Sequence, residues 1–155
     1  MKKPIFSNVD IYKAIVDESY SEMKSIDAGS KVQREGGEGW VKQYDPESRS
    51  FKKAMIITVF TGMWLEASLH LLIVRKFGEQ KFKDYDFKSY RDKLVLLNIS
   101  DQSLLDEVDK FKLTRKELVH EKAYFDKGVV KMAQSEAELA YSIVQRLSVA
   151  FSQVG

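Results

Sequence analysis

The chain of 155 residues contains no cysteine. This absence excludes disulfide bonds, thiolate catalysis and cysteine-ligated zinc sites, and it fits the cytoplasmic location that we expect. The chain also lacks an excess of either charge, because 25 lysines and arginines are set against 23 acidic residues, for a formal net charge of +2. There is thus no general cationic field of the kind that binds nucleic acid indiscriminately, and any site for a polyanion must be local.

Several signatures of catalytic and nucleotide-binding sites are missing as well. Gly36, Gly37 and Gly39 have neither the following strand nor the Lys-Ser/Thr pair of a phosphate-binding loop. No dinucleotide fingerprint and no nucleophile elbow is present. The polar and acidic residues that follow the first four positions are unlike a secretory signal. We expect one domain over 1–155, without a cofactor or a bound metal.

The hydrophobic pattern predicts an all-α protein. Apolar residues recur at helical spacing in five segments, and no run alternates with the period of two that marks a strand. The predicted fold is an antiparallel bundle of four to five helices, joined early in the chain by a flexible glycine-containing loop over about 29–45, in which Trp40 would fix one end. The predicted helices cover about 7–28, 46–77, 86–97, 100–120 and 135–151.

Polar residues mark the starts of these helices. Asp45 followed by Pro46 is typical of a first turn, with a capping carboxylate and then a proline whose missing N–H costs nothing. Asp86 and Asp101 are the predicted caps of the third and fourth helices, the third of which carries Phe87 and Tyr90 on its apolar face. Ser135 with Glu138 resembles a capping box at the start of the last helix.

The segment 54–74 is apolar over about the length that crosses a bilayer. Glu66 and His70 near its middle would be costly in lipid, so we expect the central helix of a soluble bundle and no membrane partner. The same two residues, four apart on one helix face, suggest a metal site. We favour instead a contact of Glu66 with Arg115 and a satisfied His70 in the core or at an interface.

The fourth predicted helix carries an arginine on its apolar face. With about 100° per residue, Val108, Phe111 and Leu118 lie within about 40° of Leu104, and Arg115 falls inside this stripe. An unpaired charge at such a position is costly, so Arg115 needs a partner or a cleft. It either pairs with Glu66, which would mainly set the helix register, or opens onto a groove or dimer seam that admits a phosphate, and both can hold together.

Five residues after Arg115 stands His120. An arginine supplies a permanent charge and a planar donor fork for a phosphate, and a histidine exchanges protons near neutral pH. The two residues lie about 140° apart around an ideal helix, so a shared site requires a long arginine arm, a frayed helix end or a second copy of the chain. Lys116 shares the face of His120 and either adds a second cation or is an ordinary solvated lysine.

These residues resemble the HEPN family of prokaryotic toxins and defence proteins, whose hallmark is R-x(4 to 6)-H in an all-helical bundle. The similarity extends from about Phe51 to Phe151 and includes the sequences Leu65-Glu66-Ala67, Asp92-Lys93-Leu94 and Ile99-Ser100-Asp101.

The resemblance implies metal-independent RNA cleavage at a composite site between two protomers. Arg115 and His120 match the family's catalytic pair, while Glu66 resembles an acidic position on the preceding long helix. Lys116 departs from the Asn, Asp or His that often follows the family arginine. The family resemblance also implies an RNA substrate, a homodimer and, for a toxin or phage-defence protein, an antitoxin partner.

Two other functional classes stay open. One is a non-catalytic module of the same fold that binds RNA, a nucleotide or a protein through the Arg115 region, and the other is a purely structural bundle. Aromatic residues between 82 and 90 alternate with lysines and an arginine, a pattern that can hold single-stranded nucleic acid. We favour a core role for Phe87 and Tyr90 in this stretch.

Overall fold

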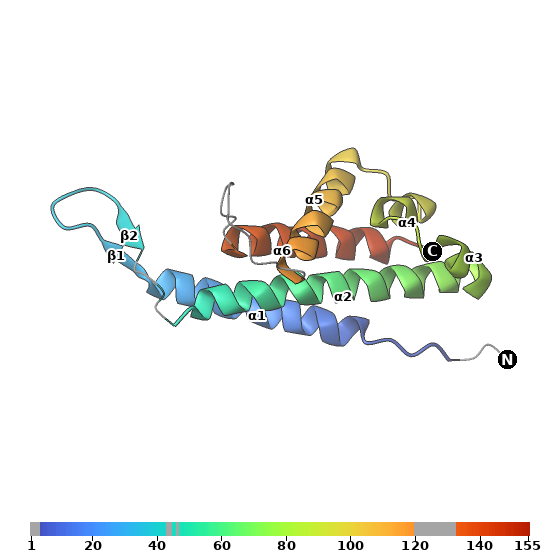
Figure 1. Ribbon diagram of the computed structural model, residues 1–155, viewed down its shortest axis with the longest axis horizontal. Helices are drawn as coiled ribbons and strands as arrows, with labels where there is room; N and C mark the ends of the chain where they lie inside the picture. The colour runs from blue at the N-terminus through green and yellow to red at the C-terminus, as the bar shows by residue number, and fades with distance from the viewer. Residues whose placement is uncertain (1–3, 43–44, 46, 120–132) are drawn as a thin grey trace.

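The computed structural model describes residues 4–42, 45, 47–119 and 133–155. Over these residues the protein is all-α apart from one small hairpin, with six helices packed against one another (Figure 1). The helices are α1 (Val9–Gly29), α2 (Arg49–Phe77), α3 (Glu79–Tyr85), α4 (Tyr90–Leu96), α5 (Gln102–Val119) and α6 (Ala133–Ser152).

The long helix α2 is the centre of the molecule. It contacts α1 along one side and α6 along another, and it also touches α3, α4 and α5. Figure 1 shows α1 antiparallel to α2, whereas α6 runs in the same direction as α2 and α5 crosses them steeply. The predicted antiparallel arrangement therefore describes α1 and α2 but does not extend to α5 and α6.

The core lies where these helices face α2. Val16 and Met23 of α1 are completely buried. Ile57, Leu65 and Ile73 are completely buried on α2. The buried apolar residues of α5 are Leu104, Leu105, Val108 and Phe111, and those of α6 are Ala133, Ala137, Ala140, Ile143, Val144 and Leu147. Burial of these apolar surfaces is the main force that holds the helices together.

The segment between the first two helices, predicted as a glycine-containing loop, contains two short strands that the sequence pattern did not predict. Strands β1 (Lys31–Gln33) and β2 (Trp40–Lys42) form an antiparallel hairpin that projects beyond the ends of α1 and α2 (Figure 1). Gly36 and Gly39, with φ of 72° and 111°, provide the left-handed backbone that the connecting turn needs. Each strand has three residues, which is too short for an alternating pattern to be recognised.

Two predicted helix starts need correction. Helix α2 begins at Arg49 after the N-cap residue Ser48, and Pro46 lies outside the described residues. The Asp45 carboxylate nevertheless accepts hydrogen bonds from the backbone N–H groups of Arg49 and Ser50 at 2.9 and 3.0 Å, from three residues before the cap position. Asp86 caps no helix start, because it follows the last residue of α3 in a helical conformation.

The short helix predicted over 86–97 is α4, and α3 precedes it in a segment where no helix was predicted. Helix α4 starts after Ser89, whose side chain and that of Asp92 form a reciprocal capping box. Phe87 consequently falls in the turn between α3 and α4, where it is 97% exposed and not part of a core.

Glu138 has a tertiary role in place of the predicted capping role. Ser135 lies inside α6, two residues after Ala133, so the proposed box does not mark the start of this helix. The Glu138 carboxylate accepts hydrogen bonds from the Tyr20 hydroxyl at 2.7 Å and from Lys24 at 2.8 Å. The Glu138 carboxylate therefore bonds to side chains of α1 and not to the backbone N–H groups at the start of α6. The Tyr20 ring also stacks on Tyr141 of α6, with ring centroids 3.6 Å apart. The contacts join the first helix to the last.

Among the described residues, α2 is the one helix long and apolar enough to cross a membrane. Half of its most apolar 18-residue window is buried within the molecule.

Candidate functional site

The apolar face of α5 carries Arg115 as the helical phase predicts. Leu104, Val108 and Phe111 are buried on this face, and Arg115 follows one turn later with a side chain that is 26% exposed. Thr114 beside it is buried and donates a hydrogen bond to Glu136 of α6 at 2.9 Å. The end of α5 is therefore attached to α6 on one side while Arg115 points toward α2.

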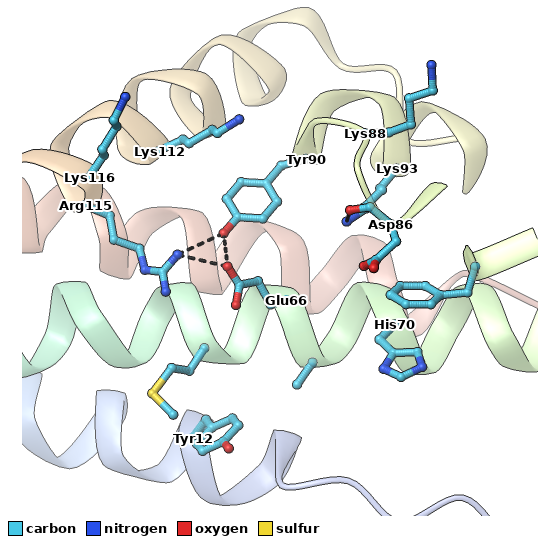
Figure 2. Close-up of a pocket in the computed structure, with 13 residues that line it drawn as sticks. Tyr12, Glu66, His70, Asp86, Lys88, Tyr90, Lys93, Lys112, Arg115 and Lys116 are labelled. Atoms are coloured by element: carbon cyan, nitrogen blue, oxygen red, sulfur yellow. Dashed lines mark hydrogen bonds and ion pairs between the residues drawn. The ribbon is translucent and has the colours of Figure 1, made fainter. Parts of the chain in front are cut away.

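Arg115 forms the ion pair with Glu66 that was one of its two predicted environments. Its Nη1 donates to Glu66 Oε1 at 2.9 Å and to the hydroxyl oxygen of Tyr90 at 3.2 Å. The Tyr90 hydroxyl in turn donates to the same Glu66 oxygen at 2.6 Å. Figure 2 shows this triangle, which we call the Arg115 cluster, with its three members contributed by α5, α2 and α4. Each member fixes the orientation of the other two.

A glycine of α2 makes room for the guanidinium. A Cβ atom at Gly62 would lie 2.2 Å from Nε and 2.4 Å from Cδ of Arg115, so the side chain rests directly on the backbone of α2. Nε is buried there without a hydrogen-bond partner among the described residues. Nη1 is occupied, and Nη2, like Nε, has no acceptor in the described part of the chain, but unlike Nε it is not among the buried atoms that lack a partner. This nitrogen can serve a ligand.

The environment of Tyr90 keeps its hydroxyl protonated. Burial, followed by the hydrogen bond to the Glu66 carboxylate, raises the pKa of Tyr90 far above its usual range. The phenol thus remains a donor to Glu66 at every physiological pH, which maintains the orientation of the carboxylate that holds Arg115.

The Arg115 cluster forms part of the wall of an open groove of about 730 Å³ between α2, α4 and α5 (Figure 2). Five cationic side chains line it against two carboxylates, although the whole chain is nearly neutral. The cationic residues are Lys88, Lys93, Lys112, Arg115 and Lys116, and the acidic ones are Glu66 and Asp86. A local cationic surface of this kind favours an anionic ligand.

The groove cations differ in how far they are committed to partners. Lys93 donates to the backbone carbonyl of Asp86 at 3.1 Å. Lys112 lies 6.0 Å from the centre of the Tyr90 ring, and Lys116 is exposed at the rim. For Lys112 and Lys116 no carboxylate partner is found in the described ranges, so their charges remain available to a ligand. Lys116 is therefore placed to act as a second cation, beside Arg115, toward an anionic ligand of the groove.

His70 lies at the other end of the same groove. It is exposed, neither buried in the core nor enclosed by described neighbours, and its ring stacks on Phe82 of α3 with centroids 4.0 Å apart. The metal site suggested by Glu66 and His70 receives no support, because no group of three or more metal-ligating acids or histidines is found within 4–42, 45, 47–119 and 133–155. Glu66 is engaged with Tyr90 and Arg115 instead.

The remaining predicted site residue, His120, lies outside the described residues. Sequence reasoning had placed Tyr90 in the core, where it is indeed 8% exposed, but missed its hydroxyl as the third member of the Arg115 cluster. It also missed Gly62. A glycine inside a long apolar helix was the available signal, because such a residue often marks a close approach of another chain segment.

Comparison of this chain with protein-family models, curated proteins and solved structures finds no match.

Proposed function

We propose that this protein is a metal-independent endoribonuclease of the HEPN type. The observation that supports this most is Arg115, which Glu66 and Tyr90 hold on the wall of a cation-lined groove, with no acceptor for Nη2 among the described residues. An arginine in this state is pre-oriented for a phosphate, because its carboxylate partner fixes the planar guanidinium without occupying all of its donors. Glu66 and Tyr90 act as positioning residues, and Lys116 adds charge at the rim.

The proposed chemistry is attack of a ribose 2′-hydroxyl on the adjacent phosphorus. The 2′-oxygen forms a bond to phosphorus while the bond from phosphorus to the 5′-oxygen breaks, leaving a 2′,3′-cyclic phosphate and a free 5′-hydroxyl. His120 takes the proton of the 2′-hydroxyl, and a second histidine returns one to the leaving 5′-oxygen. Arg115 stabilises the negative charge that develops on the phosphate oxygens.

The active form in this proposal is a homodimer. Arg115 and His120 lie about 140° apart on an ideal helix, so one straight helix does not present them to the same phosphate. Two chains that face each other supply two arginines and two histidines, which also provides separate groups for accepting and donating a proton. A role as a toxin or phage-defence component, with an antitoxin as partner, remains a prediction of the family resemblance.

A non-catalytic RNA- or nucleotide-binding module is the second candidate. It is favoured by the groove itself, since the cations that line it can hold phosphates whether or not His120 takes part in a reaction.

The deciding experiment incubates the purified chain with a mixed set of single-stranded and structured RNAs in the presence of a metal chelator. The proposal expects cleavage with cyclic phosphate and 5′-hydroxyl ends, lost in both Arg115→Ala and His120→Ala. Arg75→Ala is the control, because Arg75 is an exposed arginine of α2 that does not line the groove. Cleavage that persists in His120→Ala contradicts the acid–base assignment. RNA binding that requires Arg115, with no cleavage by a folded dimer, identifies the binding module.

A further inference from the structure

The groove is longer than the Arg115 cluster requires. Gly62, Glu66 and His70 lie on successive turns of one face of α2, which spans about 12 Å from first to last at 1.5 Å per residue. Arg115 rests over Gly62, and His70 stands at the opposite end (Figure 2). One phosphate bound at Arg115 would therefore leave the His70 end of the groove empty.

The His70 end is built for an aromatic ring. Phe82 covers one face of the imidazole, with an angle of 20° between the rings, and His70 remains exposed to solvent despite this stack. A further planar group can extend this existing stack. Phe82 itself is supported from the other side of the groove by the ammonium group of Lys93, which lies 5.6 Å from its ring centre.

The charges at this end favour a base over a phosphate. Asp86 contributes its carboxylate here, and the Lys93 ammonium already donates to the Asp86 carbonyl. Lys88 also lies at this end, but its side chain extends away from His70 (Figure 2). Lys112, Arg115 and Lys116, in contrast, gather at the α5 end of the groove (Figure 2). The groove is thus cationic at its Arg115 end and aromatic at its His70 end. A single-stranded nucleic acid fits this order when a phosphate binds at Arg115 and an unstacked nucleobase lies on His70.

The groove also continues past His70. A second hollow of about 310 Å³ is bordered by residues 5–8 of the N-terminal segment and by Leu71. It shares Tyr12, Ala67 and His70 with the first groove, so the two hollows are contiguous at the histidine. A linear ligand can therefore pass over His70 and onto the N-terminal segment.

We propose that His70, stacked on Phe82, is a nucleobase platform in a track for single-stranded RNA that runs along α2 from Arg115 to the N-terminal segment. This inference rests on the proposed function, because it takes RNA as the ligand of the groove. A duplex is excluded from the platform because its bases are stacked on each other, whereas the bases of a single strand are free to stack on an aromatic side chain.

The test measures binding of fluorescently labelled oligoribonucleotides by polarisation, in a His120→Ala background that prevents turnover. A dinucleotide and an octanucleotide without secondary structure are compared. His70→Ala is expected to weaken octanucleotide binding by about ten-fold, the usual range for loss of one base-stacking ring. His70→Tyr retains a stacking ring and is expected to restore most of the affinity. The dinucleotide is expected to show a smaller effect, because it can occupy the Arg115 end alone.

Arg75→Ala again serves as the control, since it removes a charge from α2 outside the groove. Binding that depends on Arg115 but is unchanged in His70→Ala overturns the platform and leaves the proposed function intact. Equal weakening in His70→Ala and His70→Tyr also overturns it, because stacking would then not be the contribution of His70. If His70 is required for binding but the chain with native His120 cleaves no RNA, the track stands and the nuclease proposal fails. Absence of any RNA binding contradicts both the His70 platform and the proposed nuclease function.

Discussion

Two arginines join neighbouring helices through carboxylates, and they differ in how completely their charge is compensated. Arg91 of α4 donates from Nη2 to Asp106 and from Nε to Asp109, both on α5, the latter at 2.7 Å. The hydrogen bond to Asp109, followed in size of effect by the one to Asp106, raises the pKa of Arg91. Among the described residues, Arg115 has a single carboxylate partner, Glu66, which it shares with Tyr90.

The comparison separates a structural arginine from one prepared for a ligand. Two carboxylates cancel the positive charge of Arg91 and leave the local total negative, so that residue has little attraction for an anion. At Arg115 one carboxylate balances the cation, and Lys112 and Lys116 nearby make the local total positive. Both arginines hold helices together, but only Arg115 combines that role with an attraction for phosphate.

The largest expected effect on RNA cleavage comes from substituting the two arginines in turn, which tests the difference between them directly. Arg115→Ala is expected to lower the rate of RNA cleavage by about 100-fold or more, the usual cost of removing a donor that stabilises transition-state charge. Arg91→Ala is expected to leave the rate close to that of the unaltered chain, because its charge is already neutralised. Initial rates on one labelled RNA, with melting temperatures to verify folding, provide the measurement. Equal losses in the two variants would show that the distinction between the arginines is wrong.

A smaller effect is expected from displacing Arg115 without removing its charge. In Gly62→Ala the new Cβ would meet Nε and Cδ of Arg115 at 2.2 and 2.4 Å, so the flexible side chain must move away from Glu66. Misplacement of a catalytic group by about 1 Å costs up to about 100-fold in rate, and we expect a loss of about 10-fold to 100-fold. Folding should survive, because alanine stabilises a helix interior by up to about 1 kcal/mol relative to glycine.

Gly29→Ala is the matched control for this substitution. Gly29 is the last residue of α1, and a Cβ there would meet nothing within 4 Å. Cleavage rates and melting temperatures of both variants are compared with those of the unaltered chain. Full activity in Gly62→Ala would mean that contact with Glu66 is not needed to position Arg115.

The smallest effect on cleavage, a few-fold loss, is expected from Tyr90→Phe, which removes the hydroxyl that braces Glu66 and retains the ring. Loss of this hydrogen bond is expected to lower the free energy of unfolding by about 1 kcal/mol near neutral pH. The pH dependence provides a sharper signal. Because the pKa of Tyr90 is raised in the folded state, its contribution is fully present below about pH 10, the usual tyrosine pKa, and is lost as the pH rises toward the folded-state value.

Urea unfolding between pH 8 and pH 11 measures this difference. The unaltered chain should lose stability above about pH 10 more steeply than Tyr90→Phe, which lacks the titrating group. Tyr85→Phe is a suitable control, since Tyr85 has no hydrogen bond to an acid among the described residues and Lys81 lies over its ring. Parallel pH curves for the unaltered chain and Tyr90→Phe would contradict the buried Tyr90–Glu66 hydrogen bond.

Prediction from the sequence was most accurate where the signal is local. The apolar stripe of α5 is confirmed by the burial of Val108 and Phe111. The predicted end of the second helix at residue 77 is also confirmed, since α2 ends at Phe77 and Gly78 follows with a φ of 89°. Prediction failed where a local pattern competes with distant partners. Glu138 had the spacing of a capping box, but Tyr20 and Lys24 recruit it from 118 and 114 residues away.

For the candidate site, the sequence determined that Arg115 lies on the apolar face of its helix and therefore needs compensation, because helical phase depends only on residues a few positions apart. The tertiary structure decided how that need is met. Glu66 lies 49 residues from Arg115 and Tyr90 lies 25, and Gly62 provides the space beneath the guanidinium. It also decided that His70 is an exposed member of the groove. Such choices depend on how whole helices pack, and the periodicity of a single helix contains no information about its partners.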